Sequence, residues 1–352
     1  MYSLLRPILF RLDPERAHML TLVALRAAQN FSPALWMLHL MYAAPEKPVN
    51  AFGLNFRNPI GLAAGYDKDG VAIRGLSALG FSHVEIGTVT LQPQDGNPKP
   101  RVFRLPEDEA VINRMGFPSR GSVRVRQQLK SNQKINAIEY ALGRAPRRLD
   151  VILGINLGKN RTTPNEEAVL DYLALLENFA SYADYLTINV SSPNTVGLRQ
   201  LQGRAALEGL LTQLHAQRKH EEARLKKRLP LLVKLAPDLT DPELDDALDV
   251  ILRTGMDGVI ATNTTLARDG VRSALAGEAG GLSGSPLRVR SEAMLEKTVR
   301  RLDGRLPVVS AGGIMNPEDA KRRLDLGAAL IQIYTGLVYR GPGFVKAIAR
   351  ML

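Results

Sequence analysis

From residue 58 onward, short apolar runs alternate with segments of helical spacing. Each run is rich in β-branched residues, ends in a polar or glycine-rich tip, and is followed by a helical pattern of apolar positions. Eight such runs occur, over residues 59–64, 83–89, 151–157, 185–190, 231–235, 258–262, 307–311 and 330–333. Apolar strands between helices indicate a parallel sheet covered on both faces, and eight repeats predict an α/β fold closed into a (β/α)8 TIM barrel.

Residues 1–44 follow a different pattern and predict a small helical domain ahead of the barrel, which would occupy residues 45–352. Asp13-Pro14-Glu15 and Ser32-Pro33 each combine a capping side chain with a proline in the first turn, which predicts helices over 14–29 and 33–43. Neither is long enough to span a bilayer. The second is apolar on nearly every side, so packing on the barrel or a second subunit, and insertion into a membrane interface, both remain open.

Four segments outside the strands add detail to the barrel. Residues 49–56 predict a small hairpin that plugs the barrel floor. The stretch 106–148 is long for one connection and predicts an excursion over the active face, with mobility expected in its polar tip, residues 132–148. Thr240-Asp241-Pro242-Glu243 and Asn316-Pro317-Glu318 are helix-start signals and support strand–loop–helix order.

Composition narrows the possible chemistry. The chain has 352 residues, 45% hydrophobic and 23% charged, as in a soluble globular protein, and it has no cysteine. Disulfides, thiolate metal sites and cysteine catalysis are therefore excluded, and no metal site is expected. The net charge of +11 favours an anionic partner. The densest basic cluster, residues 218–228, contains two glutamates and no aromatic residue, so a solvated helix face is favoured over a nucleic-acid contact.

The strand ends carry the candidate chemistry, because TIM barrels build their sites at the carboxyl ends of the strands. In chain order, the tips offer Gly65, Asp67 and Lys68; Thr88; Asn156; Asn189, Ser192 and Asn194; Lys234; Asn263 and Thr264; Gly312 and Gly313; and Tyr334 and Thr335. Any one tip could serve only as a helix cap or a turn. Eight polar tips together indicate a binding site.

Two features of these tips point to a phosphorylated ligand. Ser310-Ala311-Gly312-Gly313 and Tyr334-Thr335-Gly336 follow the last two strands, where barrels commonly hold a phosphate through backbone N–H groups. A third glycine cluster, residues 280–284, could close over the same phosphate. Lys234 lies within an apolar strand, where a buried ammonium needs a negative partner unless it snorkels to solvent. Flavin mononucleotide (FMN), whose ring becomes anionic on reduction, is a suitable ligand.

Six motifs in order give the chain a family resemblance. They are the stretches 61–70 (Gly-Leu-Ala-Ala-Gly-Tyr-Asp-Lys-Asp-Gly), 113–117 (Asn-Arg-Met-Gly-Phe), 154–160 (Gly-Ile-Asn-Leu-Gly-Lys-Asn), 189–194 (Asn-Val-Ser-Ser-Pro-Asn), 261–265 (Ala-Thr-Asn-Thr-Thr) and 281–284 (Gly-Leu-Ser-Gly). Together they resemble the dihydroorotate dehydrogenase family, and they span nearly the whole chain. The absence of a cysteine base, the serine at position 192 and the amino-terminal helical pair resemble class 2, the quinone-linked, membrane-associated branch.

The resemblance implies a role for each motif. FMN would be held by Ala64, Gly65, Tyr66, Asp67, Lys68, Thr88, Asn156, Asn189, Lys234, Thr262, Gly284, Gly313, Tyr334 and Thr335. Dihydroorotate would be surrounded by Lys68, Asn113, Arg114, Met115, Gly116, Phe117, Asn189, Asn194, Asn263 and Thr264. Ser192 would be the catalytic base, Lys234 would stabilise the reduced flavin, and Thr195 and Phe117 would shield and relay the proton.

The implied activity is oxidation of (S)-dihydroorotate to orotate in de novo pyrimidine (UMP) biosynthesis, with electrons passing through FMN to a membrane quinone. Residues 1–44 would lead the quinone to the flavin and attach the protein peripherally to the cytoplasmic face of the inner membrane, with no role for nucleic acid. Pro118-Ser119 departs from the family pattern, which usually has asparagine after Phe117, so closure of this loop is in question. Two alternatives remain open: another flavin-dependent barrel oxidoreductase, and a non-catalytic barrel that binds an anionic ligand.

Overall fold

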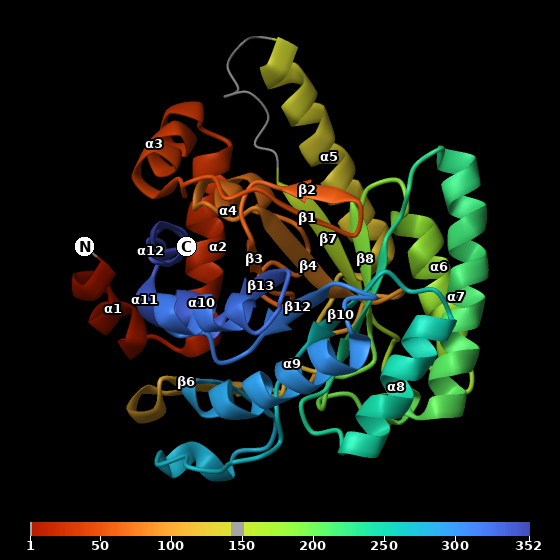
Figure 1. Ribbon diagram of the computed structural model, residues 1–352. Helices are drawn as coiled ribbons and strands as arrows, with labels where there is room; N and C mark the ends of the chain where they lie inside the picture. The colour runs from red at the N-terminus through yellow and green to blue at the C-terminus, as the bar shows by residue number, and fades with distance from the viewer. Residues whose placement is uncertain (1, 142–150) are drawn as a thin grey trace.

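The computed structural model describes residues 2–141 and 151–352, and its centre is a closed parallel barrel (Figure 1). The barrel order is β10-β12-β13-β3-β4-β7-β8-β9, so strands that follow one another around the ring pair in parallel and β13 closes onto β3. The strands are β3 (Ile60–Leu62), β4 (His83–Val89), β7 (Ile152–Leu157), β8 (Tyr185–Asn189), β9 (Leu231–Leu235), β10 (Gly258–Ala261), β12 (Val308–Ala311) and β13 (Leu330–Ile333). All eight strands predicted from the apolar runs are confirmed, and so is the TIM barrel.

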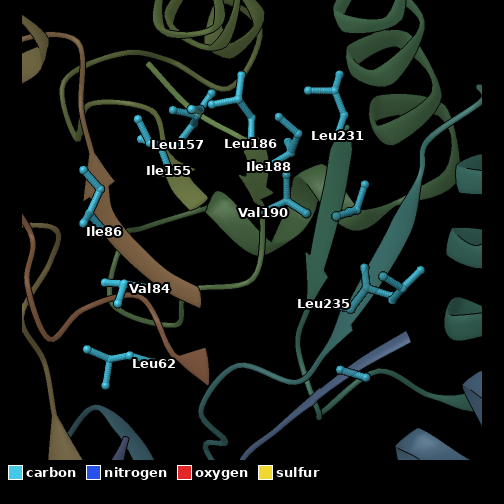
Figure 2. Close-up of a cluster of buried hydrophobic side chains, with 14 of the residues drawn as sticks. Leu62, Val84, Ile86, Ile155, Leu157, Leu186, Ile188, Val190, Leu231 and Leu235 are labelled. Carbon is cyan, nitrogen blue, oxygen red and sulfur yellow. The ribbon is translucent and has the colours of Figure 1, made fainter. Parts of the chain in front are cut away.

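Side chains along each barrel strand point alternately toward the helices and into the barrel. Val84 and Ile86 of β4, and Leu186 and Ile188 of β8, belong to the large buried cluster that fills the space between the barrel and its helices (Figure 2). Because successive side chains of a strand point to opposite faces, Glu85 between the β4 pair is directed into the barrel instead. The apolar side chains that face the helices therefore fix the register of the strands, and this register directs the polar side chains into the barrel.

Helices cover the outside of the barrel. They are α4 (Ile73–Ala78), α5 (Gly121–Ala141), α6 (Ala168–Phe179), α7 (Arg204–Leu225), α8 (Asp241–Arg253), α9 (Arg288–Leu302), α10 (Pro317–Asp325), α11 (Thr335–Arg340) and α12 (Phe344–Met351). Short 3-10 helices lie at Pro106–Asp108, Leu198–Gln202, Ala274–Gly277 and Ser285–Leu287. The start signals act as the sequence predicts: Thr240 and Glu243 form a capping box on α8, and the Asn316 side chain accepts from Asp319 N at 2.7 Å on α10.

A hairpin closes the floor, as predicted for residues 49–56. Its strands β1 (Val49–Ala51) and β2 (Leu54–Phe56) pair in antiparallel fashion. Phe52 and Phe56 pack with Leu232 and Ile260 in a buried cluster inside the barrel. In Figure 1 this hairpin lies at one end of the barrel and β6 lies toward the other. The floor of the interior is thus filled by apolar side chains, which leaves the opposite end for a ligand.

The excursion at the mouth includes a sheet that the sequence did not reveal. Strands β5 (Val102–Leu105), β6 (Ala110–Asn113) and β11 (Gly281–Gly284) form a three-stranded antiparallel sheet in the order β11-β6-β5. The third glycine cluster is therefore largely a strand. In the polar stretch 132–148, helix α5 continues through Ala141, and residues 142–150 lie outside the described residues, so the expected mobility stays a prediction.

The amino-terminal segment contains three helices: the two that were predicted are confirmed, and one before them was missed. They are α1 (Tyr2–Arg11), α2 (Pro14–Gln29) and α3 (Ser32–Tyr42). Pro7 lies inside α1, and a proline in this position argues against a helix in the sequence. Contacts with α11 offset the hydrogen bond that the proline removes, since Tyr2 OH donates to Val338 O at 2.5 Å. Asp13 caps α2 as predicted, whereas α3 begins at Ser32 itself, with Phe31 at the N-cap position and no side-chain cap.

The faces of these helices are divided between the barrel and the outside. On α3, Leu35 is buried, whereas Trp36, Met37 and Leu40 are each more than half exposed. Leu38 packs against the main core, so α3 lies on the barrel with one face and leaves the other uncovered. Within the described part of the chain, no helix is both long and apolar enough to cross a membrane.

Several residues of the basic cluster at 218–228 form ion pairs. Arg218 is buried and pairs with Asp257 at 2.5 Å, and Arg228 pairs with the same carboxylate at 2.9 Å. Glu221, which is also buried, pairs with Arg224 at 2.5 Å. The expectation of a solvated face is confirmed for the exposed basic residues Lys219, Arg224, Lys226 and Arg228. It fails for Arg218, because this part of α7 packs on the loop that leads into β10.

Candidate active site

One cavity of about 940 Å³ joins the carboxyl ends of the barrel strands to the amino-terminal helices. Its wall includes nearly every residue that the resemblance assigns to a site. These are Ala64, Gly65, Tyr66, Asp67, Lys68, Thr88, Asn113, Met115, Gly116, Phe117, Asn189, Ser192, Asn194, Lys234, Thr262, Asn263, Thr264, Gly284, Gly313, Tyr334 and Thr335. The fold thus gathers residues from the ends of most strands around a single space.

Ser192 lies in the loop that follows β8 and is about 95% buried, yet it lines the cavity. Its Oγ accepts a hydrogen bond from Asn194 N at 3.3 Å, which holds the tight turn and leaves the hydroxyl proton free to point elsewhere. The Asn194 side chain donates from Nδ2 to Asn113 Oδ1 at 3.2 Å, so the serine loop is tied to the end of β6. Ser192 therefore faces a space bordered by amides.

Behind these side chains lies a chain of amide hydrogen bonds. Asn156 is fully buried and does not line the cavity. Its Oδ1 accepts from Thr88 Oγ1 at 2.6 Å and from Asn189 Nδ2 at 3.0 Å. Asn189 Oδ1 in turn accepts from Ser191 Oγ at 3.0 Å and from Asn263 Nδ2 at 3.3 Å. Asn156 thus supports the cavity residues from below, and amide dipoles at the rim are held in a fixed direction.

Two lysines bring positive charge to the cavity. Lys68 donates to Gly65 O at 2.7 Å, and burial lowers its pKa to about 8. Lys234 is about 95% buried, and burial lowers its pKa as well. The burial of Lys234 agrees with the prediction of a lysine inside the barrel and argues against the alternative of snorkelling to solvent. Both amines favour an anionic ligand, because a ligand charge repays the desolvation of the ammonium groups.

The glycine loops form a cradle in which side chains do not fit. A Cβ on Gly313 would lie 2.3 Å from Arg288 Cα, and one on Gly284 would lie 2.3 Å from Glu109 O, and both glycines have positive φ. Arg323, which is fully buried, donates to Gly312 O at 3.1 Å and to Ser291 Oγ at 2.8 Å. The loop at Gly312 and Gly313 is therefore held close to α9 with its backbone along the cavity wall.

Two predicted site residues use their side chains elsewhere. Arg114 does not line the cavity: it pairs with Glu278 at 2.5 Å and its guanidinium lies 4.6 Å from the centre of the Phe103 ring. The buried Asp67 carboxylate accepts from Val71 N at 2.9 Å and Ala72 N at 2.8 Å. Burial raises the pKa of Asp67 to about 6. Asp67 thus shapes the loop after β3.

The loop that carries Phe117 is held despite Pro118. Gln94 Nε2 donates to Phe117 O at 2.9 Å and to Gly116 O at 3.2 Å. Ser119 N donates to Gln94 O at 2.9 Å, next to the proline that has no N–H of its own. Gly116 and Phe117 both have positive φ, so the turn directs Phe117 into the cavity wall.

Aromatic rings connect this space with the amino-terminal helices. The His18 ring of α2 packs edge-on against Tyr66 with 4.7 Å between centroids, and Tyr66 packs against Tyr334 at 5.7 Å. Thr21 Oγ1 and Tyr66 OH are 3.1 Å apart. Burial, and next the charge of Lys68, lowers the pKa of His18 to about 4, so this histidine is neutral and packed. The part of the wall contributed by α1, α2 and α3 is otherwise mainly apolar, with Leu5, Leu9, Leu22, Leu25 and Leu38.

Sequence reasoning missed two polar residues of this region, Glu85 and Gln332. Glu85 is fully buried below the cavity, and Gln332 reaches it from β13. A polar residue at an inward position of an apolar strand was the available signal, as it was for Lys234. Among the described residues, no group of three or more His, Asp or Glu side chains could hold a metal ion.

Comparisons with known proteins agree with this geometry. Residues 48–352 match the family model described as dihydroorotate dehydrogenase. A relative from Flavobacterium lutescens, named dihydroorotate dehydrogenase (quinone), is 50% identical over 98% of this chain and 94% of its own length. A relative of the same name from Idiomarina loihiensis is 46% identical over the full length of both chains. The crystal structure of DHODH in complex with ferulenol from Eimeria tenella superposes with a TM-score of 0.83 and 38% identity, over 96% of this chain and 90% of that one. The chain therefore belongs to the dihydroorotate dehydrogenase family, and the relatives that match it from end to end are its quinone-dependent members.

Proposed function

We propose that this protein oxidises dihydroorotate to orotate and passes the electrons through FMN to a membrane quinone. One observation carries the proposal: Ser192, a set of amides, the buried Lys234, the partly buried Lys68 and a glycine cradle line one cavity that continues to an apolar amino-terminal entrance. The name shared by full-length relatives supports the same reaction. The alternative of a non-catalytic barrel leaves the buried serine and the apolar entrance without a use.

The residues present fit FMN. The cradle at Gly284 and Gly313 leaves room where a Cβ would collide with backbone, which suits the close approach of a phosphate to main-chain N–H groups. Thr335 contributes a hydroxyl beside it, 2.8 Å from Ser283 Oγ. Lys234 supplies the positive charge that a reduced, anionic flavin ring requires. When bound, FMN would accept the hydride that leaves carbon 6 of the substrate.

The remaining polar wall suits dihydroorotate. The substrate has one carboxylate and a ring of amide-type donors and acceptors, and asparagine offers both kinds of partner without adding a negative charge. Asn113, Asn194 and Asn263 stand on three different elements around Ser192, and Lys68 is the cation available to the carboxylate. None of these four side chains brings a negative charge toward the anion.

Ser192 is the proposed catalytic base, which removes the proton from carbon 5. A hydroxyl is a weak base, so position and exclusion of water must compensate. The Ser192 side chain is about 95% buried, and Phe117 lies in the same wall. Thr195 Oγ1 is buried without a hydrogen-bond partner among the described residues, so it is free to pass a proton onward from Ser192.

The amino-terminal helices, residues 1–44, are the proposed route for the quinone and the site of membrane attachment. Their inner faces line the cavity with leucines, and the exposed face of α3 presents Trp36, Met37 and Leu40. An amphipathic element of this kind can lie in the interface of a membrane without crossing it. The proposed location is the cytoplasmic face of the inner membrane, and the ion-paired basic cluster leaves no reason to propose a nucleic-acid partner.

Stopped-flow absorbance of the purified protein tests the proposal. We expect bound flavin, rapid loss of its oxidised absorbance with dihydroorotate, and rapid reoxidation by a quinone. Parallel reoxidation with fumarate and with a nicotinamide acceptor should be slow. Protein that is colourless and cannot be reconstituted with FMN would refute the cofactor, and preferential reoxidation by fumarate or nicotinamide would refute the quinone.

A further inference from the structure

The barrel interior holds a buried carboxylate that takes no part in the proposed reaction steps. TIM barrels fill their interior with layers of mostly branched apolar side chains. The floor of this barrel follows that rule, but one layer nearer the mouth Glu85 of β4 has no solvent exposure at all. A carboxylate in such a place is costly unless it is well partnered. The hydrogen-bond donors around the Glu85 carboxylate therefore indicate its role.

Four side chains donate hydrogen bonds to Glu85. Asn156 Nδ2 donates to Oε1 at 2.8 Å. Gln332 Nε2, Tyr185 OH and Thr187 Oγ1 donate to Oε2 at 2.8, 3.1 and 3.2 Å. An ionised carboxylate is a pure acceptor, and it is the state that uses all four donors at once. The arrangement is thus built around a negative charge in the middle of the barrel.

This charge sets the direction of the amides above it. Because Glu85 takes the NH₂ group of Asn156, the Asn156 oxygen must face the other way, toward Thr88 and Asn189. The Asn189 NH₂ group then points down, and its oxygen points toward Ser191 and Asn263. One acceptor at the bottom therefore fixes which amide atoms are free at the cavity.

The charge also acts on Lys234 of β9. Lys234 and Asn189 are paired neighbours in the barrel sheet, so the lysine stands beside this amide chain. Burial lowers the Lys234 pKa, and the charge of Glu85 opposes that change. The other titratable groups around the carboxylate are Tyr185, whose pKa is raised mainly by burial, and His83, whose pKa burial lowers to about 3. Both are neutral near pH 7, so the carboxylate and the ammonium are the charged pair of this layer, with Asp184 acting on Tyr185 from the edge.

The geometry points to Glu85 as a positioning residue of the active site, a buried counter-charge that keeps Lys234 protonated and orients the amides of Asn156 and Asn189. This inference rests on the proposed FMN site, which it deepens. It assigns Glu85 no contact with substrate or cofactor. Its effect is exerted through Lys234 and the amide chain.

The first test measures the reduction potential of bound flavin against pH in the holoenzyme. Glu85→Gln keeps the shape but removes the charge. At low pH, Lys234 then carries an unopposed positive charge and reduced flavin is favoured. As pH rises, Lys234 loses its proton earlier than in the wild type and the preference reverses. We expect the two curves to cross, with a tenfold difference in the reduced-to-oxidised ratio at the acidic end, about 30 mV for a two-electron couple.

Two matched variants separate charge from packing. Thr187→Val removes one donor to Glu85 and no charge, so its curve should run parallel to that of the wild type. Glu85→Asp retains the charge and should restore the wild-type dependence on pH. A Glu85→Gln enzyme that binds flavin and follows the wild-type curve at every pH would overturn the inference.

A second measurement does not depend on flavin. If Glu85 and Lys234 compensate each other, Lys234→Met leaves a lone buried carboxylate, and adding Glu85→Gln should raise the thermal unfolding temperature of the apoprotein above that of Lys234→Met alone. A double variant that is less stable than Lys234→Met would contradict the pairing, even if Glu85→Gln alone failed to fold. Wild-type protein that binds no FMN would instead refute the proposed function, so the two failures are distinguishable.

Discussion

Replacing Gly313 by alanine tests the phosphate cradle most directly. Gly313 has a φ of +71°, and the added Cβ would lie 2.3 Å from Arg288 Cα, about 1 Å inside the 3.4 Å at which ordinary contact begins. Two effects follow. Positive φ costs a non-glycine residue roughly 1–2 kcal/mol. The collision with backbone also forces the loop away from α9, because main chain cannot rotate aside as a side chain can.

Gly304 provides a matched control, because its φ is also +71° but its added Cβ meets nothing within 4 Å. Gly304→Ala therefore isolates the backbone strain, offset by roughly 0.4–1 kcal/mol of lost chain entropy in the unfolded state. With an unfolding entropy of about 2.1 cal/mol/K per residue, a net loss near 1 kcal/mol lowers the unfolding temperature by only about 1–2 °C. Gly304→Ala should bind FMN as the wild type does.

Gly313→Ala should lose FMN affinity in addition. Each charge-assisted hydrogen bond to a phosphate contributes about 1.5–3 kcal/mol, so displacing even one N–H group predicts at least about a tenfold rise in the FMN Kd. Fluorescence titration of the apoproteins with FMN measures the Kd, and thermal unfolding measures stability. If Gly313→Ala and Gly304→Ala bound FMN equally well, the phosphate would lie elsewhere and the reasoning would be refuted.

Three further predictions concern the proposed reaction. Ser192→Ala should retain FMN but slow its reduction by dihydroorotate by about 10²-fold or more in stopped-flow, since the base is lost; unchanged reduction would remove Ser192 from that role. The pKa of Lys68 lies at about 8, so the amine is protonated below that pH, and kcat/KM for dihydroorotate should fall as pH rises through 8; a profile flat to pH 9.5 would contradict this. Leu22→Gln places an amide on the apolar cavity wall and should raise the quinone KM by about tenfold without slowing flavin reduction. Val23→Gln, on the exposed face of α2, should change neither the quinone KM nor the rate of flavin reduction. If the two variants changed the quinone KM equally, a quinone route along this wall would be contradicted.

The sequence predicted the barrel because its signal is local and repeated. Each strand such as β4 or β8 is an apolar run with a polar tip, and the start signals of α8 and α10 act within a few residues. Helix α1 was missed because Pro7 argues against a helix, and only contacts with the far end of the chain overcome that preference.

The sequence predicted the site residues whose place follows from the end of a strand. It missed the residues whose role depends on partners far away in the sequence. Ser192 and Lys234 follow from the place of each strand end. The sequence could not show that Arg114 turns to Glu278, because those residues are 164 positions apart and meet only when β6 pairs with β11. Glu85 was overlooked for a similar reason, since the donors to its carboxylate come from three other strands.

The anchoring of α1 has a consequence for how the enzyme is made on the ribosome. Tyr2 and Arg6 bond to the carbonyls of Val338 and Tyr339, which lie 336 and 333 positions further along the chain. Strand β3 likewise waits for β13 before the ring can close. Helix α1 therefore cannot take its place until the α11 segment has been made, whereas α2 and α3 also contact α4, which is synthesised soon after them. The apolar entrance of the cavity is thus completed by α1 only when the barrel itself is nearly complete.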